Sequence, residues 1–251
     1  MNVKGQAAIV TGAGSGLGAA TAEALAAAGA KVALLDINEA GLKDVAETTG
    51  GLAIACDVGS AEAAEAAVAQ AREANGPCRV LVNCAGIAPG KRIVGRDGPM
   101  PLADFESVIR VNLIGSFNML RLAAADMLAC EPLEDGERGV IISTSSIAAS
   151  EGQMGQVAYA ASKAGVTGMM LPAAREFAKK GVRVLTVAPG LIGTPLLLNM
   201  PQEVQDNLAG QVPFPHRFGK PEEYAGLVMH LVENVMLNAD SFRIDGGMRM
   251  Q

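Results

Sequence analysis

Ala7-Ala-Ile-Val-Thr-Gly-Ala-Gly-Ser-Gly-Leu-Gly18 joins a short apolar run to a long Ala-rich segment near the start of the chain. The apolar run predicts a buried strand, and residues 17–28 predict a helix. Glycines between a strand and a helix permit a tight turn, and the free amides at the helix start bind a pyrophosphate. We therefore expect a dinucleotide at this turn. The residues expected to contact it there are Gly12, Ser15, Gly16, Leu17 and Gly18.

The same alternation of short apolar runs and longer helical segments continues along the chain. Predicted strands cover residues 7–11, 31–36, 52–56, 80–83, 140–143 and 183–188. Predicted helices cover residues 17–28, 38–49, 61–75, 102–127 and 159–179. Repeated strand–helix–strand units imply a parallel sheet with helices on both faces, and strands without polar alternation are typical of such buried sheets. We expect an α/β, doubly wound parallel sheet (a Rossmann fold), with residues 1–251 as a single domain.

Two segments rich in Pro or Gly interrupt this alternation, at residues 88–101 and 190–218. Neither resembles a linker or a low-complexity region. Long ordered loops are more often functional than short ones. We expect both segments to frame a substrate pocket.

Composition excludes several classes of partner. The net charge of −6 argues against a general binder of nucleic acid or of anionic membranes. No run of about 18 apolar residues is present, so we expect no membrane span. Aromatic residues make up only 3% of the chain, which does not suit platforms for stacking bases. Small polar or anionic metabolites fit better.

The cysteines point to an intracellular protein without a metal site. Cys56, Cys78, Cys84 and Cys130 form no Cys-x-x-Cys interval, and only two histidines are present. Zinc-site spacings are therefore absent. The first predicted strand begins almost at the first residue, which leaves no room for a signal peptide. We expect reduced thiols and a cytoplasmic location.

Asp36 closes the second predicted strand, twenty residues after Gly16. A carboxylate at that point accepts hydrogen bonds from the ribose hydroxyls of adenosine and repels a 2′-phosphate. Neither Ser15 nor Ile37 is basic, so nothing adjacent would neutralise such a phosphate. The pattern predicts NAD rather than NADP. The alternative interpretation of Asp36 is an N-cap of the helix that starts near Asn38.

Two further strand ends carry candidate cofactor residues. Asp57 could receive the adenine amino group, with Val58 packing on the ring, although an isolated Asp there is more often an N-cap. Asn83-Cys-Ala-Gly86 follows the fourth strand and predicts a turn of small residues under the cofactor. The predicted contacts in that turn are Asn83, Cys84, Ala85 and Gly86. Strand termination alone would explain the same turn equally well.

Tyr159 and Lys163 lie four residues apart in a predicted helix. That spacing stacks the two side chains on one face, and a nearby positive charge favours phenolate over phenol. A tyrosine so placed can exchange protons near neutral pH. Chance also produces such pairs on many helices, so the pair alone does not establish a catalytic site.

Taken together, the motifs resemble the short-chain dehydrogenase/reductase family over essentially the whole chain. The matching pieces, in order, are Thr-Gly-x3-Gly-x-Gly at Thr11 to Gly18, Asn83-x-Ala-Gly86, Asn112, Ser146, Tyr159-x3-Lys163 and Pro189-Gly190. Several ordered motifs are much more specific than any one of them. Cys84 stands where many members of the family have a second Asn.

The resemblance assigns roles to four residues. It implies that Tyr159 is the general acid/base, that Lys163 lowers the pKa of Tyr159 and holds the nicotinamide ribose, and that Ser146 orients the substrate oxygen. Asn112 would help to anchor a proton-relaying water. The family interval of thirteen residues before the tyrosine selects Ser146 over Ser145, which would then be structural.

The second half of the chain resembles one group within the family, the 17β-hydroxysteroid dehydrogenases of type 10, also called type II short-chain 3-hydroxyacyl-CoA dehydrogenases. Residues 139–156, 188–197, 211–215 and 243–251 carry this resemblance. It implies NAD-dependent interconversion of (3S)-3-hydroxyacyl-CoA and 3-oxoacyl-CoA, including 2-methyl-3-hydroxybutyryl-CoA, in fatty-acid or isoleucine degradation. It also implies a homotetramer.

The same resemblance suggests where substrate and nicotinamide lie. Lys91, Arg92 and Arg96 could meet CoA phosphates, and the apolar run from Leu191 to Leu198 could line an acyl pocket. A solvated basic loop and a packed core explain these features about as well. The predicted substrate residues are Ser146, Gln156, Tyr159 and Leu196. Near the nicotinamide, the predicted residues are Pro189, Gly190, Ile192 and Thr194.

Three alternatives are weighed against this interpretation. A 3-oxoacyl-carrier-protein reductase shares the catalytic group but usually uses NADPH, which Asp36 disfavours. Another alcohol or steroid dehydrogenase of the same family would share every motif. A non-catalytic NAD-binding scaffold would be free to lose Ser146, Tyr159 and Lys163, which are all present.

Overall fold

One parallel sheet runs through the part of the chain that the structure describes, in the strand order β3-β2-β1-β4-β7-β8-β9. The structure is a computed structural model, and it describes residues 1–250 apart from the side chain of Leu196; Gln251 lies outside the described residues. The strands are β1 (Ala7–Thr11), β2 (Lys31–Asp36), β3 (Leu52–Ala55), β4 (Cys78–Asn83), β7 (Gly139–Thr144), β8 (Val182–Pro189) and β9 (Ser241–Ile244). The predicted doubly wound parallel sheet is confirmed.

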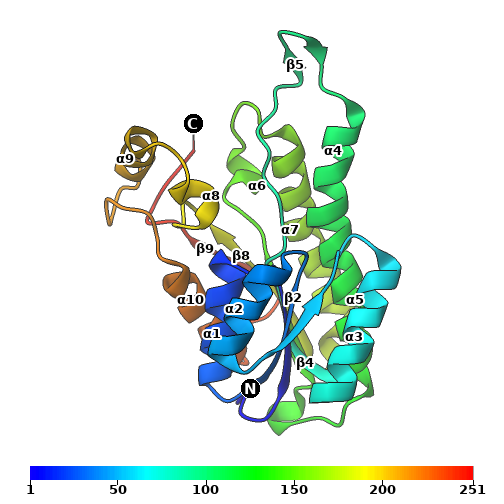
Figure 1. Ribbon diagram of the computed structural model, residues 1–251. Helices are drawn as coiled ribbons and strands as arrows, with labels where there is room; N and C mark the ends of the chain where they lie inside the picture. The colour runs from blue at the N-terminus through cyan, green and yellow to red at the C-terminus, as the bar shows by residue number, and fades with distance from the viewer. Residues whose placement is uncertain (251) are drawn as a thin grey trace.

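Helices cover both faces of the sheet (Figure 1). On one face, Ala8 and Val10 of β1 pack with side chains of α1 (Gly16–Ala27), α2 (Glu39–Thr49) and α10 (Pro221–Glu233). On the other, Ile9 packs with α3 (Ala61–Asn75), α5 (Gly115–Ala129) and α7 (Val157–Phe177). Alternate residues of a strand point to opposite faces, so apolar runs are needed to fill both cores.

The chain reverses its direction across the sheet at β1. From β1 it builds outward to β2 and β3, and then returns to place β4 on the other side of β1. In open parallel sheets, ligands bind outside the carboxyl ends of the strands at such a reversal. The fold therefore places the expected cofactor turn, Gly12 to Gly18, at this position.

The long predicted helix at residues 102–127 is interrupted. It consists of α4 (Leu102–Ile109), the π-helical turn η1 (Arg110–Ile114) and α5. The stretch Leu102–Ala129 is long and apolar enough to cross a membrane. Half of its most apolar part is buried inside the molecule, as is typical of a core helix. Its length and composition are therefore weak evidence for a membrane-spanning helix.

The two segments expected to be loops contain short elements. Residues 88–101 carry a hairpin, β5 (Val94–Gly95) and β6 (Gly98–Pro99), which projects from the body of the molecule (Figure 1). Residues 190–218 contain α8 (Pro195–Leu198) and α9 (Gln202–Gly210). The remaining short helices are η2 (Glu134–Gly136), α6 (Ala148–Glu151) and η3 (Ala178–Lys180).

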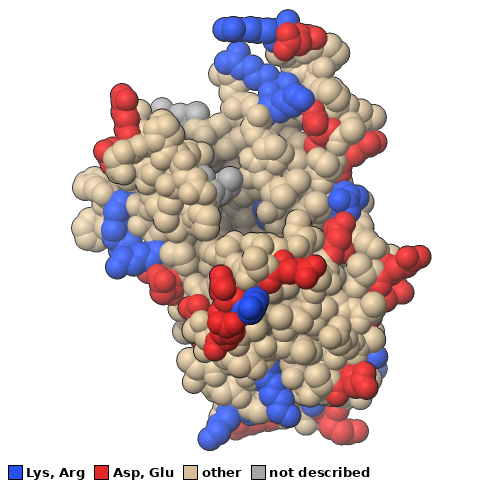
Figure 2. Space-filling view, in the orientation of Figure 1, with Lys and Arg blue, Asp and Glu red and all other residues tan. Residues whose placement is uncertain are grey.

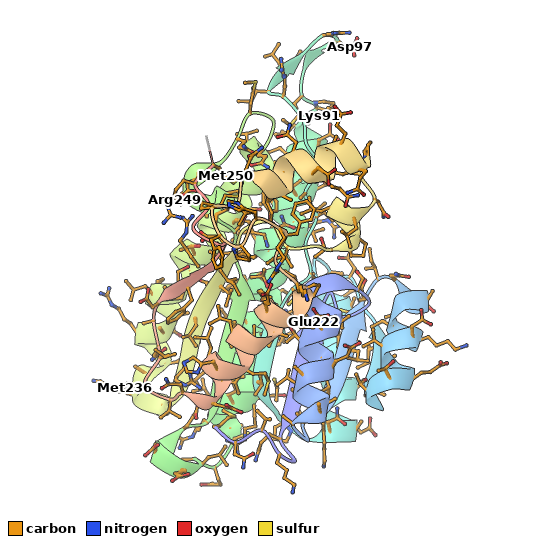
Figure 3. The ribbon with its side chains drawn as sticks, turned by 90° about the vertical axis from the view of Figure 1, so that its left-hand side faces the viewer. Lys91, Asp97, Glu222, Met236, Arg249 and Met250 are labelled. Atoms are coloured by element: carbon orange, nitrogen blue, oxygen red, sulfur yellow. The ribbon has the colours of Figure 1, made fainter. Side chains whose placement is uncertain are left out.

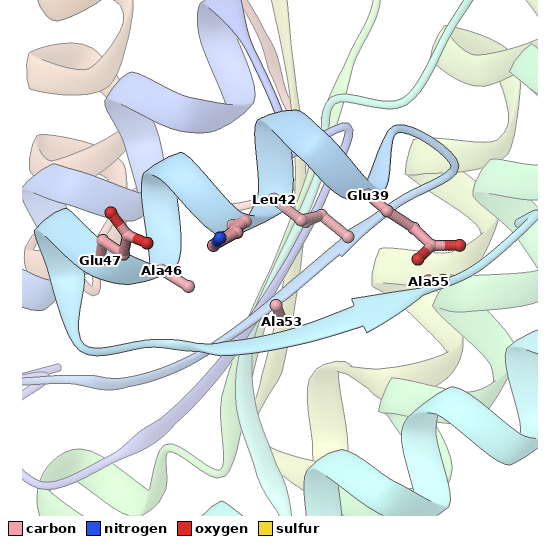
Figure 4. A pocket seen from close by; sticks show the side chains of 7 residues that line it. Glu39, Leu42, Ala46, Glu47, Ala53 and Ala55 are labelled. Atoms are coloured by element: carbon pink, nitrogen blue, oxygen red, sulfur yellow. The ribbon is translucent and has the colours of Figure 1, made fainter.

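The edge strand β3 departs from the prediction that the strands are buried on both sides. Ala53 and Ala55 are exposed, because only β2 lies beside β3 in the sheet. A groove of about 410 Å³ lies between β3 and α2 (Figure 4). Its lining residues are Glu39, Leu42, Lys43, Ala46, Glu47, Ala53 and Ala55. None of them lines the cofactor cleft described below.

Candidate active site

A cleft of about 390 Å³ opens at the carboxyl ends of β1, β2, β3 and β4. Figure 2 shows the surface hollowed between the segment that carries α8 and α9 and the segment that carries α4. The predicted cofactor residues that line this cleft are Gly12, Ser15, Gly16, Leu17, Gly18, Asp36, Asp57, Val58, Cys84, Ala85, Gly86 and Thr194. The lining residues that the sequence analysis did not assign are Leu35, Ile37, Cys56, Ile87, Arg110, Val111 and Pro195.

Two glycines of the turn leave no room for a side chain. At Gly12, which has φ +65°, a Cβ would lie 2.7 Å from the backbone nitrogen of Ala85. At Gly18, a Cβ would lie 2.1 Å from the carbonyl oxygen of Gly12. The turn therefore packs directly against the end of β4 and the start of α1. The close approach leaves the first amides of α1 facing the cleft, where they suit an anion.

The Asp36 carboxylate is fixed at the rim of the cleft. Its Oδ2 accepts a hydrogen bond from Gly14 N at 2.9 Å, and its Oδ1 accepts one from Asn38 N at 2.9 Å. Asn38, not Asp36, caps α2, because its side chain accepts from Gly41 N. The N-cap interpretation of Asp36 is therefore wrong. Beside it, Ile37 is 74% exposed and forms an apolar edge of the cleft.

Asp57 is paired rather than free. Its Oδ2 accepts from Arg110 Nη1 at 2.8 Å, and its Oδ1 accepts from Gly59 N at 2.9 Å. The hydrogen bond from Arg110 is the main cause that holds the pKa of Asp57 below its usual value. Arg110 comes from η1, more than fifty residues later in the chain, and no local pattern marks it as a cleft residue.

Ser146 and Tyr159 meet on the substrate side of the cleft. Their side chains are hydrogen-bonded, and Ser146 Oγ also accepts from Ala148 N at 3.1 Å. Ser145 points elsewhere, with its Oγ 2.7 Å from Thr167 Oγ1 and 3.1 Å from the Lys163 carbonyl oxygen, to which it donates. The geometry therefore places Ser146, and not Ser145, at the predicted position beside the tyrosine.

Lys163 is buried beside Tyr159. Its Nζ donates to the Thr144 carbonyl at 2.7 Å and lies 5.8 Å from the centre of the Tyr159 ring. Burial lowers the pKa of Lys163 to about 8. Burial also raises the pKa of Tyr159, and the Ser146 hydroxyl opposes that rise. That Lys163 lowers the pKa of Tyr159 stays a prediction.

Asn112 lies in the π-helical turn η1 and is completely buried. Its Oδ1 accepts from Ile87 N at 2.8 Å, and its Nδ2 donates to Ile87 O at 2.9 Å and Ser162 Oγ at 3.0 Å. A Cβ at Gly86 would lie 3.2 Å from Asn112 Oδ1 and 3.5 Å from Lys163 Nζ. Gly86 thus lets Asn112 and Lys163 approach the same point. A water-anchoring role for Asn112 stays a prediction.

Besides Tyr159 and Lys163, four predicted cofactor residues do not line the cleft. Asn83 is turned inward, where its Nδ2 donates to Ser143 Oγ at 3.1 Å and to Ser116 O at 3.3 Å, so its side chain ties β4 to its neighbours. Pro189 is buried at the end of β8. At Gly190, a Cβ would lie 2.8 Å from the Asp245 side chain, so this glycine serves packing of the C-terminal segment. Ile192 is buried and lines a separate cavity of about 130 Å³.

The predicted acyl pocket is not a single surface. Leu191 and Ile192 line the small cavity, which is closed by residues near Val212 and Ile244, whereas Leu198 is 52% exposed. The side chain of Leu196, a predicted substrate residue, lies outside the described part of the structure. The chain turns into α8 at Pro195, so the leucines of α8 are on a different element from Leu191 and Ile192. That these residues line an acyl pocket stays a prediction.

Gln156 lies between α7 and the projecting hairpin. Its Oε1 accepts from Gln153 N at 3.1 Å, and it lines a groove of about 450 Å³ with Arg92 and Val94. In the hairpin segment, Lys91 pairs with Asp104, whereas Arg92 and Arg96 are exposed. Figure 3 shows Lys91 at the base of this projection and Asp97 near its tip.

The C-terminal segment covers the loop that follows Ser146. Arg243 in β9 pairs with Glu151 at 2.7 Å and with Asp245 at 2.6 Å. Glu151 also accepts a hydrogen bond from Met250 N at 3.0 Å, and Figure 3 shows Arg249 and Met250 side by side in this region. Glu151 is 92 residues from Arg243 and 99 residues from Met250 in the sequence. The sequence offered no signal for this contact.

Comparison with known proteins agrees with the geometry. The family model for the short chain dehydrogenase matches residues 6–205. The chain is 50% identical to 3-hydroxyacyl-CoA dehydrogenase type-2 of Bos taurus, covering 100% of this chain and 97% of the relative, and 45% identical to the protein of that name from Drosophila melanogaster, covering 99% of each. It is 36% identical to human (3R)-3-hydroxyacyl-CoA dehydrogenase, covering 97% of this chain and 95% of the relative.

A solved structure extends the comparison to three dimensions. The crystal structure of 3-hydroxyacyl-CoA dehydrogenase type-2 from Mycobacterium avium superposes with a TM-score of 0.94 at 39% identity, over 98% of this chain and 97% of that one. The resemblance on which the sequence analysis relied is confirmed, both for the family and for the group within it. With its nucleotide cleft, its Ser146–Tyr159 pair and its buried Lys163, the chain belongs to the short-chain dehydrogenase family.

Proposed function

We propose that this protein is an NAD-dependent dehydrogenase that interconverts (3S)-3-hydroxyacyl-CoA and 3-oxoacyl-CoA, with 2-methyl-3-hydroxybutyryl-CoA among its substrates. The observation that carries the proposal is the hydrogen-bonded Ser146–Tyr159 pair beside a glycine-walled nucleotide cleft. Identity of 45–50% over the full chain to proteins named 3-hydroxyacyl-CoA dehydrogenase type-2 supports the substrate class.

The cleft fits a nicotinamide dinucleotide. The space that a Cβ would fill at Gly12 and Gly18 is occupied by neighbouring backbone, so the turn can approach a pyrophosphate closely. Asp36 at the rim supports NAD, because a carboxylate there binds ribose hydroxyls and repels a 2′-phosphate. Arg110, which also lines the cleft, is neutralised by Asp57. When bound, the nicotinamide supplies the hydride acceptor or donor of the reaction.

The residues on the substrate side carry the proton. In oxidation, the Tyr159 hydroxyl oxygen, as phenolate, takes the proton of the substrate alcohol while the Ser146 hydroxyl holds the substrate oxygen. In reduction the same oxygen returns the proton. Burial raises the pKa of Tyr159, so its phenolate needs the hydrogen bond from Ser146 and the charge on Lys163. With a pKa of about 8, Lys163 is mostly charged at pH 7.

A direct assay tests the proposal. Purified protein would be given NAD or NADP with (3S)- and (3R)-3-hydroxybutyryl-CoA and with the 2-methyl-branched thioester, and NADH formation would be followed. We expect turnover of the (3S) thioesters with NAD. Preference for the (3R) thioester would instead favour the activity in the name of the human relative at 36% identity. No turnover of any CoA thioester would contradict the proposal and favour a scaffold role.

The proposal extends to assembly and location. Ile114 and Phe117 near the start of α5 and Leu171 on α7 are large apolar residues that remain exposed, which supports burial of these faces in a homotetramer. Four free cysteines, three of them buried, support a reducing compartment such as the cytoplasm. Light scattering of the native protein and of Phe117→Glu tests the assembly; a monomeric native protein would contradict it.

A further inference from the structure

Tyr224 is the second of only two tyrosines in the chain, and the proposed mechanism does not use it. It lies in α10 and is completely buried. Its hydroxyl is 2.7 Å from Thr144 Oγ1 and 3.7 Å from Cys84 Sγ. A buried tyrosine hydroxyl is normally fixed by such partners. Here the partners lie at the ends of β7 and β4, next to the catalytic group.

Thr144 connects this hydroxyl to Lys163. Ser145 N donates to Val187 O in β8, and successive residues of a strand direct their backbone groups to opposite sides. The Thr144 carbonyl therefore faces β4. The last pair between β4 and β7 is Asn83 with Ser143, so no further ladder partner stands opposite. The carbonyl is left to accept from Lys163 Nζ, at 2.7 Å.

Thr144 Oγ1 is the centre of this group of contacts. It lies 2.7 Å from the Tyr224 hydroxyl, in a hydrogen bond that either hydroxyl can donate. It also lies 3.5 Å from Cys84 Sγ. Because one residue provides both Thr144 Oγ1 and the Thr144 carbonyl, fixing its side chain also restrains the strand end that holds Lys163.

We propose that Tyr224 is a positioning residue for the catalytic group, whose hydroxyl holds Thr144 so that the Thr144 carbonyl fixes the Lys163 ammonium beside Tyr159. This inference rests on the proposed function for its catalytic meaning. It assigns a role to a residue of α10 that lies outside every family motif identified in the sequence.

The ionisable groups that face Lys163 are few. They are Tyr159 on the same helix, Cys84 at the end of β4 and, through Thr144, Tyr224 on α10. No carboxylate among residues 1–250 forms an ion pair with Lys163. The charge of Lys163 therefore depends strongly on its acceptor at Thr144. If that acceptor is loosened, the ammonium is less stable, and Lys163 loses its proton at a lower pH.

Lysine NMR measures this effect without relying on activity. Protein labelled with ¹³C at lysine Cε gives one resonance for each lysine, and Lys163→Met identifies the resonance of Lys163. Burial lowers the pKa of Lys163 to about 8, so its midpoint lies within a convenient pH range. The pH dependence of kcat and the KM for NAD are measured on the same samples.

Two variants and a matched control make up the experiment. We expect Tyr224→Phe and Thr144→Val each to move the Lys163 midpoint downward by about half a pH unit, and the pair together to move it no further, because they remove one interaction. The kcat profile should shift alike while KM for NAD stays within about twofold. Thr186→Val on β8 is the control: its Oγ1 is equally buried but has no partner among the described residues.

The outcomes separate this inference from the proposed function. An unchanged Lys163 midpoint in folded Tyr224→Phe or, should that variant not fold, in Thr144→Val overturns the positioning role. An equal shift in Thr186→Val would overturn it as well, since any loss of a buried hydroxyl would then suffice. A shifted midpoint in a protein that turns over no thioester keeps the positioning role and contradicts the proposed function instead.

Discussion

The cofactor cleft and the substrate side of this molecule are built differently. The cleft is formed by the ends of parallel strands, whose register the ladder fixes, and by a glycine turn packed so closely that a Cβ at Gly12 or Gly18 would lie within 2.7 Å of backbone. The substrate side is formed by the β5–β6 hairpin, α8 and the C-terminal segment, which leave separate spaces of about 130 and 450 Å³. We infer that the cleft is preformed and that the substrate side completes its pocket when substrate binds.

The largest expected effect comes from the junction of the two regions. Tyr159→Phe removes the hydroxyl that moves the proton but keeps the ring, so kcat should fall about 10²- to 10⁴-fold. Binding of NADH, which occupies the preformed cleft, should stay within about twofold. Steady-state kinetics and NADH fluorescence titration check the two parts. The protein has no tryptophan, so protein emission interferes little with the titration.

A residual rate close to that of the native enzyme would contradict this assignment. It would mean that proton transfer does not pass through Tyr159. Loss of NADH binding in Tyr159→Phe would contradict the proposed difference between the two regions, because cofactor binding in the cleft would then require a residue of the substrate side.

Within the cleft, Asp36→Asn should change the choice of cofactor. The backbone amides of Gly14 and Asn38 hold the Asp36 carboxylate at the rim of the cleft. A hydrogen bond from a ribose hydroxyl of NAD to this charged group is worth about 1.5–3 kcal/mol. We expect kcat/KM with NAD to fall about 10- to 100-fold, and the preference for NAD over NADP to narrow. Glu39→Gln in the first turn of α2, an acid outside the cleft, is the control. An unchanged ratio of NAD to NADP would exclude Asp36 as the selector.

Lys163 should leave a signature in stability as well as in catalysis. Its pKa is lowered from 10.5 to about 8 by burial, so between these values the unfolded chain holds a proton that the folded chain has released. Stability therefore rises with pH across this window. Relative to Lys163→Met, the native protein should gain about 2 kcal/mol between pH 8 and pH 10.

Urea unfolding followed by circular dichroism at pH 7, 8, 9 and 10 measures this difference. Lys179→Met in η3 is the control, because Lys179 is exposed and the same substitution there should give a difference that does not depend on pH. If the native protein and Lys163→Met show parallel curves, the burial of Lys163 does not perturb its charge.

The regions also differed in how far the sequence could predict them. Strand order and the glycine turn follow from apolar runs and from positions where a side chain cannot fit, such as Gly12 and Gly18. These are local properties. Pro195 and Pro201 were interpreted as signs of a loop, whereas Pro195 begins α8 and Pro201 precedes α9, because proline suits the start of a helix.

Within the site, the errors concern the direction of side chains. Asn83 turned into the core because Ser143 and Ser116 offered it partners there. Arg110 reached the cleft because Asp57 holds it from another element. Such partners lie 33 to 60 residues away, and no local periodicity specifies them. A motif therefore gives the position of a residue but not always the direction of its side chain.

The smallest expected effect lies at the projecting hairpin. Lys91→Gln, Arg92→Gln and Arg96→Gln together remove three exposed charges, one of them paired with Asp104. If they attract CoA phosphates, KM for the CoA thioester should rise about threefold at low salt, since exposed charges are screened and weak. KM for a pantetheine-truncated thioester should not change. Lys179→Gln with Lys180→Gln, which removes exposed charge from the turn before β8, is the control. An equal rise in KM for the CoA thioester and for the truncated thioester would show that the hairpin shapes the pocket rather than attracting phosphate. The substrate side would then be as preformed as the cofactor cleft, against the comparison drawn above.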